Sequence, residues 1–211
     1  LIGGVIMTHG DNNGLVLPPR IAPIQAMVIP VAQHKEGVLD AATDLLNRLK
    51  AAGIRADMDA SDQSMGWKAA QYEMKGVPLR VEIGPKDMEK GQCCICRRDS
   101  GEKVFVPLAE LESTVKELLD AVHNGLYERA KKNLEDHTKV CMTMDEVKEF
   151  METEGGFAKT MWCGDEACEL KMKEVAGVSS RCMPFAQEKV SDTCVCCGKP
   201  AKHSILWGVA Y

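Results

Sequence analysis

The chain is 211 residues long and acidic: 31 Asp and Glu against 26 Lys and Arg give a formal net charge of −5. Hydrophobic residues make up 45% and charged residues 27%, proportions that exclude a disordered or collagen-like chain. No apolar run approaches the roughly 20 residues of a membrane-spanning helix, so no membrane association is expected. This length predicts one large domain or two small ones. Because the chain opens on Leu1 without an initiator Met, we expect a fragment of a larger protein.

Strand and helix patterns alternate over the first half of the chain. Short apolar or alternating runs bounded by Gly and Pro predict strands, and apolar residues at helical spacing predict helices. The predicted strands are 26–31, 54–58, 79–83, 92–98 and 103–106, and the predicted helices are 38–49 and 66–75. Strands separated by helices predict parallel βαβ units. The last two strands predict an antiparallel hairpin added to this sheet.

A long helix and a second, smaller region are predicted to follow. One apolar stripe runs from Leu108 to Leu126 and predicts a helix that fades near residue 130. The region beyond it has a helical pattern at 144–152 and strand patterns at 157–162 and 204–211. We therefore predict an α/β fold, with a mixed, mostly parallel sheet flanked by helices, followed by a smaller α+β domain.

Ten cysteines are the unusual feature of the composition. Two close groups, CGDEAC at 163–168 and CVCCG at 194–198, lie about 30 residues apart. Paired thiolates on tight turns are the typical ligands of structural zinc, which predicts a Zn²⁺ site. The predicted ligands are Cys163, Cys168, Cys194 and either Cys197 or Cys196. Inert buried thiols and a redox pair of Cys194 and Cys197 are the alternatives. Cys93, Cys94 and Cys96 are expected to pack in the sheet.

Three stretches resemble one known family. Residues 7–23, MTHGDNNGLVLPPRIAP, are similar to the third signature of class II prolyl-tRNA synthetases of the archaeal and eukaryotic type. KGVPLRVEIGPKD at 75–87 and RRDSGEK at 97–103 agree with the same family, as do the paired cysteines and the terminal Tyr211. The resemblance covers the chain from end to end.

The resemblance implies three domains and an activity. Residues 1–22 would be the last strands of a class II catalytic domain, 23–129 an α/β anticodon-binding domain and 130–211 a zinc-containing C-terminal domain. The whole enzyme would join proline to its tRNA through a prolyl-adenylate, using ATP and Mg²⁺, as a cytoplasmic homodimer formed through the missing catalytic domain. This fragment alone is not expected to be active.

The resemblance also implies site residues. Arg20 matches the signature arginine that lies against the ATP phosphates, where a guanidinium stabilises developing charge. Carboxylates and basic side chains suit the two guanines that proline anticodons share. The implied anticodon-binding residues are Glu82, Lys86, Arg97, Arg98 and Lys103. A stand-alone α/β zinc module for protein interaction is the main alternative function, and a thiol oxidoreductase is a weaker one.

Overall fold

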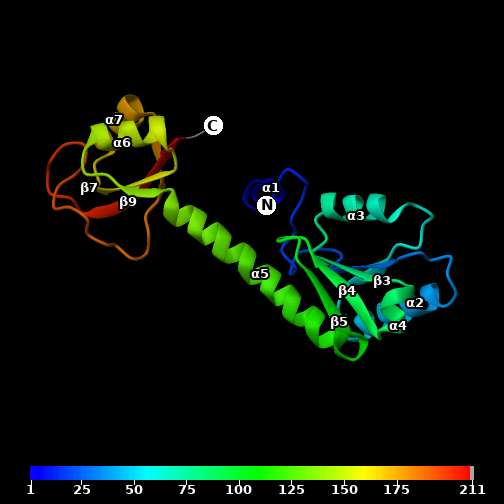
Figure 1. Ribbon diagram of the computed structural model, residues 1–211. Coiled ribbons are helices and arrows are strands. Elements are labelled where there is room, and N and C mark those ends of the chain that lie inside the picture. The colour runs from blue at the N-terminus through cyan, green and yellow to red at the C-terminus, as the bar shows by residue number, and fades with distance from the viewer. Residues whose placement is uncertain (210–211) are drawn as a thin grey trace. The chain divides into compact units, whose positions relative to one another are not determined.

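The computed structural model describes residues 1–209, so the predicted strand end at Ala210 and the family's terminal Tyr211 lie outside the described residues. The chain divides into two compact units, Leu1–Ala130 and Lys131–Tyr211. Helix α5 (Leu111–Asp136) begins in the first unit and ends in the second (Figure 1). None of the described helices is long and apolar enough to cross a membrane.

The first unit is built on a five-stranded sheet with the order β2-β1-β3-β4-β5. Its strands are β1 (Ala26–Pro30), β2 (Ala56–Met58), β3 (Leu79–Ile83), β4 (Gln92–Arg97) and β5 (Lys103–Pro107). Strand β1 pairs in parallel with β2 and β3, whereas β3–β4 and β4–β5 are antiparallel. The predicted parallel units and the added hairpin are confirmed, and the parallel and antiparallel ladders are equal in number.

Alternation along the strands gives this sheet two different faces. Val28, Val81 and Ile95 point to a core that they share with helices α2 (Val38–Ala51) and α5. On the other face, Met27 and Ile29 of β1 pack against α3 (Met65–Met74). Successive residues of a strand point to opposite faces, so the positions of β3, β4 and β5 that share this second face are mostly polar side chains and cysteines, together with the exposed Phe105 of β5. Glu82 and Lys103 stand on this second face.

The expectation of strands within residues 1–22 is wrong. The chain begins with helix α1 (Ile2–His9), followed by only an isolated bridge between Asp11 and Gly14. A strand needs a neighbour for its backbone N–H and C=O groups, and neither described sheet includes this segment. A helix pairs these groups within itself. The apolar composition of this segment therefore did not distinguish a helix from a strand.

Other elements differ in length or were not predicted. Helix α5 extends beyond residue 130 to Asp136, where good helix formers such as Ala, Lys and Glu replace the apolar stripe. A short 3₁₀ turn (Leu108–Glu110) precedes it. Helix α4 (Pro85–Glu89) is too short to show a period. Helix α7 (Glu166–Ala176) and strand β8 (Val178–Cys182) also went unpredicted, since few of their residues are buried.

The second unit is a four-stranded sheet, order β6-β7-β9-β8, with two helices packed together. It contains β6 (Thr138–Val140), α6 (Met144–Thr153), β7 (Phe157–Trp162), α7, β8 and β9 (His203–Val209). Trp207 and Phe150 are almost fully buried at its centre. The Trp207 indole donates to Thr160 Oγ1 at 2.9 Å, which satisfies its one polar group. The predicted α+β class is confirmed.

Candidate metal centre and nucleic-acid interface

The first cysteine pair lies where β7 leads into α7. Cys163 follows the strand directly, and Gly164 turns the chain with φ +88°, a conformation that favours glycine. Asp165 then caps α7, its side chain accepting from the backbone N–H of Ala167. This turn brings Cys168, in the first helical turn, back toward Cys163. Their Sγ atoms are 3.6 Å apart.

The second pair lies on a tight turn just before β9. The backbone N–H of Cys194 donates to Lys199 O at 2.8 Å, and Gly198 N–H donates to Cys194 O at 3.0 Å. Gly198 has φ +71°, so this turn also uses glycine where a left-handed residue is needed. A backbone hydrogen bond from Lys199 lowers the pKa of the Cys197 thiol to about 7, whereas burial raises the pKa of the Cys163 and Cys168 thiols.

The four sulfur atoms of Cys163, Cys168, Cys194 and Cys197 lie within 4.8 Å of one another. A zinc ion with Zn–S bonds of 2.3 Å sets its sulfur ligands about 3.8 Å apart at the corners of a tetrahedron. The observed 3.6 Å between Cys163 and Cys168 and 3.8 Å between Cys163 and Cys197 match this edge. A disulfide needs about 2.05 Å. The cluster therefore fits a tetrahedral zinc site.

Cys196, the alternative fourth ligand, packs against both the cysteine cluster and the core of the second unit, but its sulfur atom is not among the four that converge. His203 is also outside the group, with its ring centroid 6.0 Å from that of Trp162. In the other unit, Cys93, Cys94 and Cys96 are buried in the sheet, as predicted. Burial raises the pKa of the Cys93 thiol to about 11.

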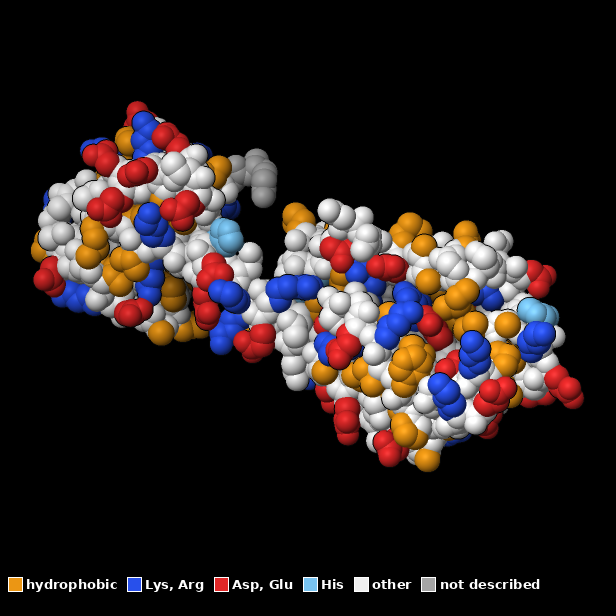
Figure 2. All heavy atoms as spheres, in the orientation of Figure 1, with side chains coloured by type: hydrophobic (Ala, Val, Ile, Leu, Met, Phe, Trp, Pro, Cys, Tyr) orange, Lys and Arg blue, Asp and Glu red, His pale blue; other side chains and the backbone are white. Residues whose placement is uncertain are grey.

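Two of the predicted nucleic-acid residues, Glu82 and Lys103, stand on the polar face of β3, β4 and β5. Strand pairing places Arg80 opposite Cys96, and Cys96 opposite Lys103. Glu82 is 8% exposed, with Arg80 Nε 3.4 Å and Lys103 Nζ 4.0 Å from its carboxylate oxygens. Figure 2 shows Lys and Arg side chains beside exposed hydrophobic ones on this unit. The face therefore offers one carboxylate between two cations.

A cavity of about 360 Å³ opens at the end of this face, beside the β4–β5 turn. Arg98 lines it, yet its side chain is only 4% exposed and its guanidinium donates twice to Asp11, at 2.6 and 2.8 Å. Arg98 Nε also donates to the backbone carbonyl of Glu73 at 2.7 Å. The hydrogen bonds from the Arg98 guanidinium lower the pKa of Asp11 to about 2. Arg98 therefore joins the turn to the N-terminal segment, and its charge is paired with Asp11.

The other predicted residues are placed differently. Arg97 lines the same cavity but binds Asp99 through two hydrogen bonds of 2.9 and 3.1 Å. Lys86 is exposed on α4, beyond the opposite end of β3. Arg20 lies apart from all of them, lining a cavity of about 270 Å³ with Lys116 and other residues. Lys103 is thus brought together with Glu82, Arg97 and Arg98.

Sequence reasoning passed over two residues of this face. Arg80 is the nearest cation to Glu82, and Phe105 is 60% exposed on β5. The alternation of β3 could have indicated Arg80, because it shares a face with Glu82 at a spacing of two. The sequence around Phe105 does not predict its exposure, because Val104, Phe105 and Val106 are all apolar and the pattern does not indicate which of them face the core.

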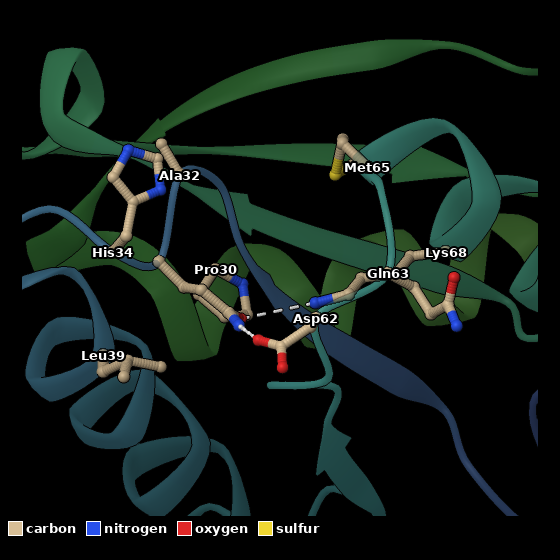
Figure 3. Close-up of a pocket in the computed structure, with 9 residues that line it drawn as sticks. Pro30, Ala32, His34, Leu39, Asp62, Gln63, Met65 and Lys68 are labelled. Atoms are coloured by element: carbon tan, nitrogen blue, oxygen red, sulfur yellow. Dashed lines mark hydrogen bonds between the residues drawn. The ribbon is translucent and has the colours of Figure 1, made fainter.

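A separate cavity of about 380 Å³ lies at the carboxyl ends of β1 and β2 (Figure 3). Its polar groups bind one another: Gln33 Nε2 donates to Asp62 Oδ1 at 3.3 Å, and Lys68 Nζ donates to Gln33 Oε1 at 3.4 Å. Lys68 is 2% exposed and also donates to the backbone carbonyl of Asp59 at 2.9 Å. These bonds join the loop after β1 to the segment after β2, so we assign them a structural role.

Two family models and several curated relatives match this chain. Residues 25–118 match the family model described as "Anticodon binding domain", and residues 144–211 match "Prolyl-tRNA synthetase, C-terminal". The whole chain is 57% identical to a proline–tRNA ligase of Clostridium novyi, 58% to one of Clostridium botulinum and 56% to one of Oceanobacillus iheyensis. In each case it covers 44% of the relative's length.

The fold and the first match define a protein with an aminoacyl-tRNA synthetase type of anticodon-binding domain, joined to a smaller domain with a four-cysteine cluster. Identity over the full chain makes the assignment more specific. The chain belongs with the C-terminal parts of the prolyl-tRNA synthetases. It spans less than half the length of the curated relatives it matches.

Proposed function

We propose that this chain recognises the anticodon of proline tRNA on the polar face of β3, β4 and β5. One observation carries the proposal: the carboxylate of Glu82 stands between the cations of Arg80 and Lys103 on the sheet face beside α3, where Arg80 also donates to the backbone carbonyl of Ala69. This face lies within the region that matches an anticodon-binding domain. It also borders a cavity that is large enough for a base.

The side chains suit guanine. A carboxylate accepts from guanine N1 and N2, while Arg or Lys donates to O6 and N7. Without RNA, Arg80 and Lys103 neutralise the Glu82 carboxylate. When guanine binds, contacts to the base replace these ion pairs, so the buried carboxylate is paired in both states. Arg97 and Arg98, bound to Asp99 and Asp11, shape the cavity, and the exposed Lys86 supplies a phosphate contact at the other end of β3.

We further propose that zinc binds Cys163, Cys168, Cys194 and Cys197. Four thiolates fill the coordination sphere and leave no open position, which makes the role structural. The ion would fix the turn between β7 and α7 to the turn before β9. These segments are about 30 residues apart in the sequence, and the second unit has only a small core.

The activity of the whole protein follows from its relatives. We propose that the complete enzyme attaches proline to its tRNA through a prolyl-adenylate, with ATP and Mg²⁺, and acts as a cytoplasmic homodimer through its catalytic domain. Residues 1–22, with Arg20 as an ATP phosphate contact, would then be the end of that catalytic domain. Residues 23–129 and 130–211 would be the anticodon-binding and zinc-binding domains.

Binding to an anticodon stem-loop tests the proposal. The purified chain should bind a fluorescein-labelled proline anticodon stem-loop, and replacing the two shared guanines should weaken binding by at least tenfold. Glu82→Gln should reduce this discrimination, because the amide keeps the shape of the carboxylate but cannot accept from both guanine nitrogens. Equal affinity for the two loops would contradict anticodon reading and favour an interaction module instead.

A further inference from the structure

Phe105 is an exposed aromatic side chain on the face that carries Glu82 and Lys103. It lies on β5 two positions after Lys103, so both point away from the core into which Val106 points. Its exposed fraction is 60%. It belongs to none of the hydrophobic clusters found among the described residues. Packing within this unit therefore gives no reason for a large apolar residue here.

The register of the sheet sets Phe105 in line with the proposed reading group. Glu82 pairs with Cys94 across β3 and β4, and Cys94 pairs with Phe105 across β4 and β5. Adjacent strands are about 4.8 Å apart, so the ring stands roughly 10 Å across the sheet from Glu82. Cys94 between them is small and buried. The row thus has a carboxylate at one end, the small side chain of Cys94 in the middle and an aromatic ring at the other end.

This arrangement has the two parts that recognition of a single-stranded base requires. Proteins read RNA through unpaired bases that stack on aromatic rings and present their edges to polar side chains. Stacking is tolerant of sequence because every base has a π-face, whereas edge contacts supply the selectivity. Glu82, Arg80 and Lys103 supply polar groups for an edge, and Phe105 is the only aromatic residue on β3, β4 and β5.

We infer that Phe105 is the stacking platform of the RNA-binding face, on which an unpaired anticodon base lies while its edge contacts Glu82 and Lys103. This inference rests on the proposed recognition of the anticodon and adds a residue to it. Phe105 contributes affinity through the base plane, and the charged neighbours contribute selectivity and the contacts that depend on salt.

Two other exposed aromatic residues of the same unit serve for comparison. Tyr127 is 61% exposed on α5, the helix that covers the opposite face of the sheet. Trp67 is 47% exposed on α3, outside the Glu82–Cys94–Phe105 row. Tyr127 is the matched control, because it has the same exposure and ring size but stands away from the proposed site.

The experiment measures fluorescence anisotropy of the labelled proline anticodon stem-loop with the full 211-residue chain. Phe105→Leu keeps an apolar side chain but removes the ring face, and should weaken binding roughly 5- to 150-fold, the range for loss of one base–aromatic stack. Phe105→Tyr should bind within about twofold of the wild type, since it restores the ring. Tyr127→Leu should leave affinity unchanged. Thermal melting of each variant verifies folding.

Salt dependence separates stacking from charge. Phe105→Leu should lower affinity without changing the slope of log K against log salt. Lys103→Gln should reduce that slope by about one phosphate contact if it binds the backbone, or relax base selectivity if it binds an edge. A Phe105→Leu chain that binds as tightly as wild type, while wild type still discriminates the guanines, overturns the stacking role alone. A wild-type chain that does not bind the stem-loop overturns both proposals.

Discussion

Removal of one zinc ligand should unfold the second unit and leave the first intact. The change is Cys168→Ser, at a residue that is 6% exposed and lies 3.6 Å from Cys163. A hydroxyl is a poor zinc ligand and is not deprotonated at neutral pH. The control is Cys182→Ser, because Cys182 is an exposed cysteine of the same unit that lies outside the cluster.

The expected size of the effect follows from the unit's small size. A unit of about 80 residues has a total stability of roughly 4–12 kcal/mol at the usual 0.05–0.15 kcal/mol per residue. A structural zinc site contributes an apparent 10–16 kcal/mol of binding free energy, which is folding free energy when the unfolded chain has no site. The zinc contribution is therefore comparable to the whole stability, and its loss should bring the unit to or beyond its unfolding midpoint.

Three measurements test this. Metal analysis should find one zinc per wild-type or Cys182→Ser chain and much less in Cys168→Ser. Trp207, fully buried in the second unit, should shift its emission to longer wavelength. Limited proteolysis should cut within residues 131–211 and spare residues 1–130. A metal-free wild-type chain, or chelation that leaves the Trp207 emission and the cleavage pattern unchanged, would refute the reasoning.

Two further changes test particular contacts. Asp11→Asn should destabilise the first unit by about 1 kcal/mol at pH 7, because Arg98 depresses the pKa of Asp11 from 3.8 to about 2 and partial exposure screens the pair. A depressed pKa gives stability that is present above pH 4 and lost as the pH falls toward 2. Hydrogen exchange should therefore show the stability difference between variant and wild type disappearing over that pH range. Gly156→Ala should cost more than Gly155→Ala in thermal unfolding, because a Cβ at residue 156 would stand 2.2 Å from His137 O whereas one at 155 meets nothing within 4 Å. Gly156 also has φ +123°, farther from the left-handed helical region than the +72° of Gly155, which adds to its cost. Equal melting temperatures would contradict this expectation.

Local pattern was sufficient for most strands and helices. Val28 and Val81 stand in runs whose period and flanking Pro or Gly define strands, and α2 shows a clear helical period. These signals depend on residues a few positions apart. For the same reason, α4 and β8 were missed, because each is five residues long and neither carries a periodic apolar face.

The sequence by itself determined the alternation of elements, the two cysteine groups and the family. Tertiary structure alone decided that Asp11 neutralises Arg98, 87 positions away, and that Cys197 rather than Cys196 joins the sulfur cluster. It also decided that Phe105 stands exposed on the same sheet face as Glu82, two strands away. The physical reason is that strand register and turn geometry set these neighbours. Both depend on which distant segments pair, and a linear pattern of side chains does not specify that pairing.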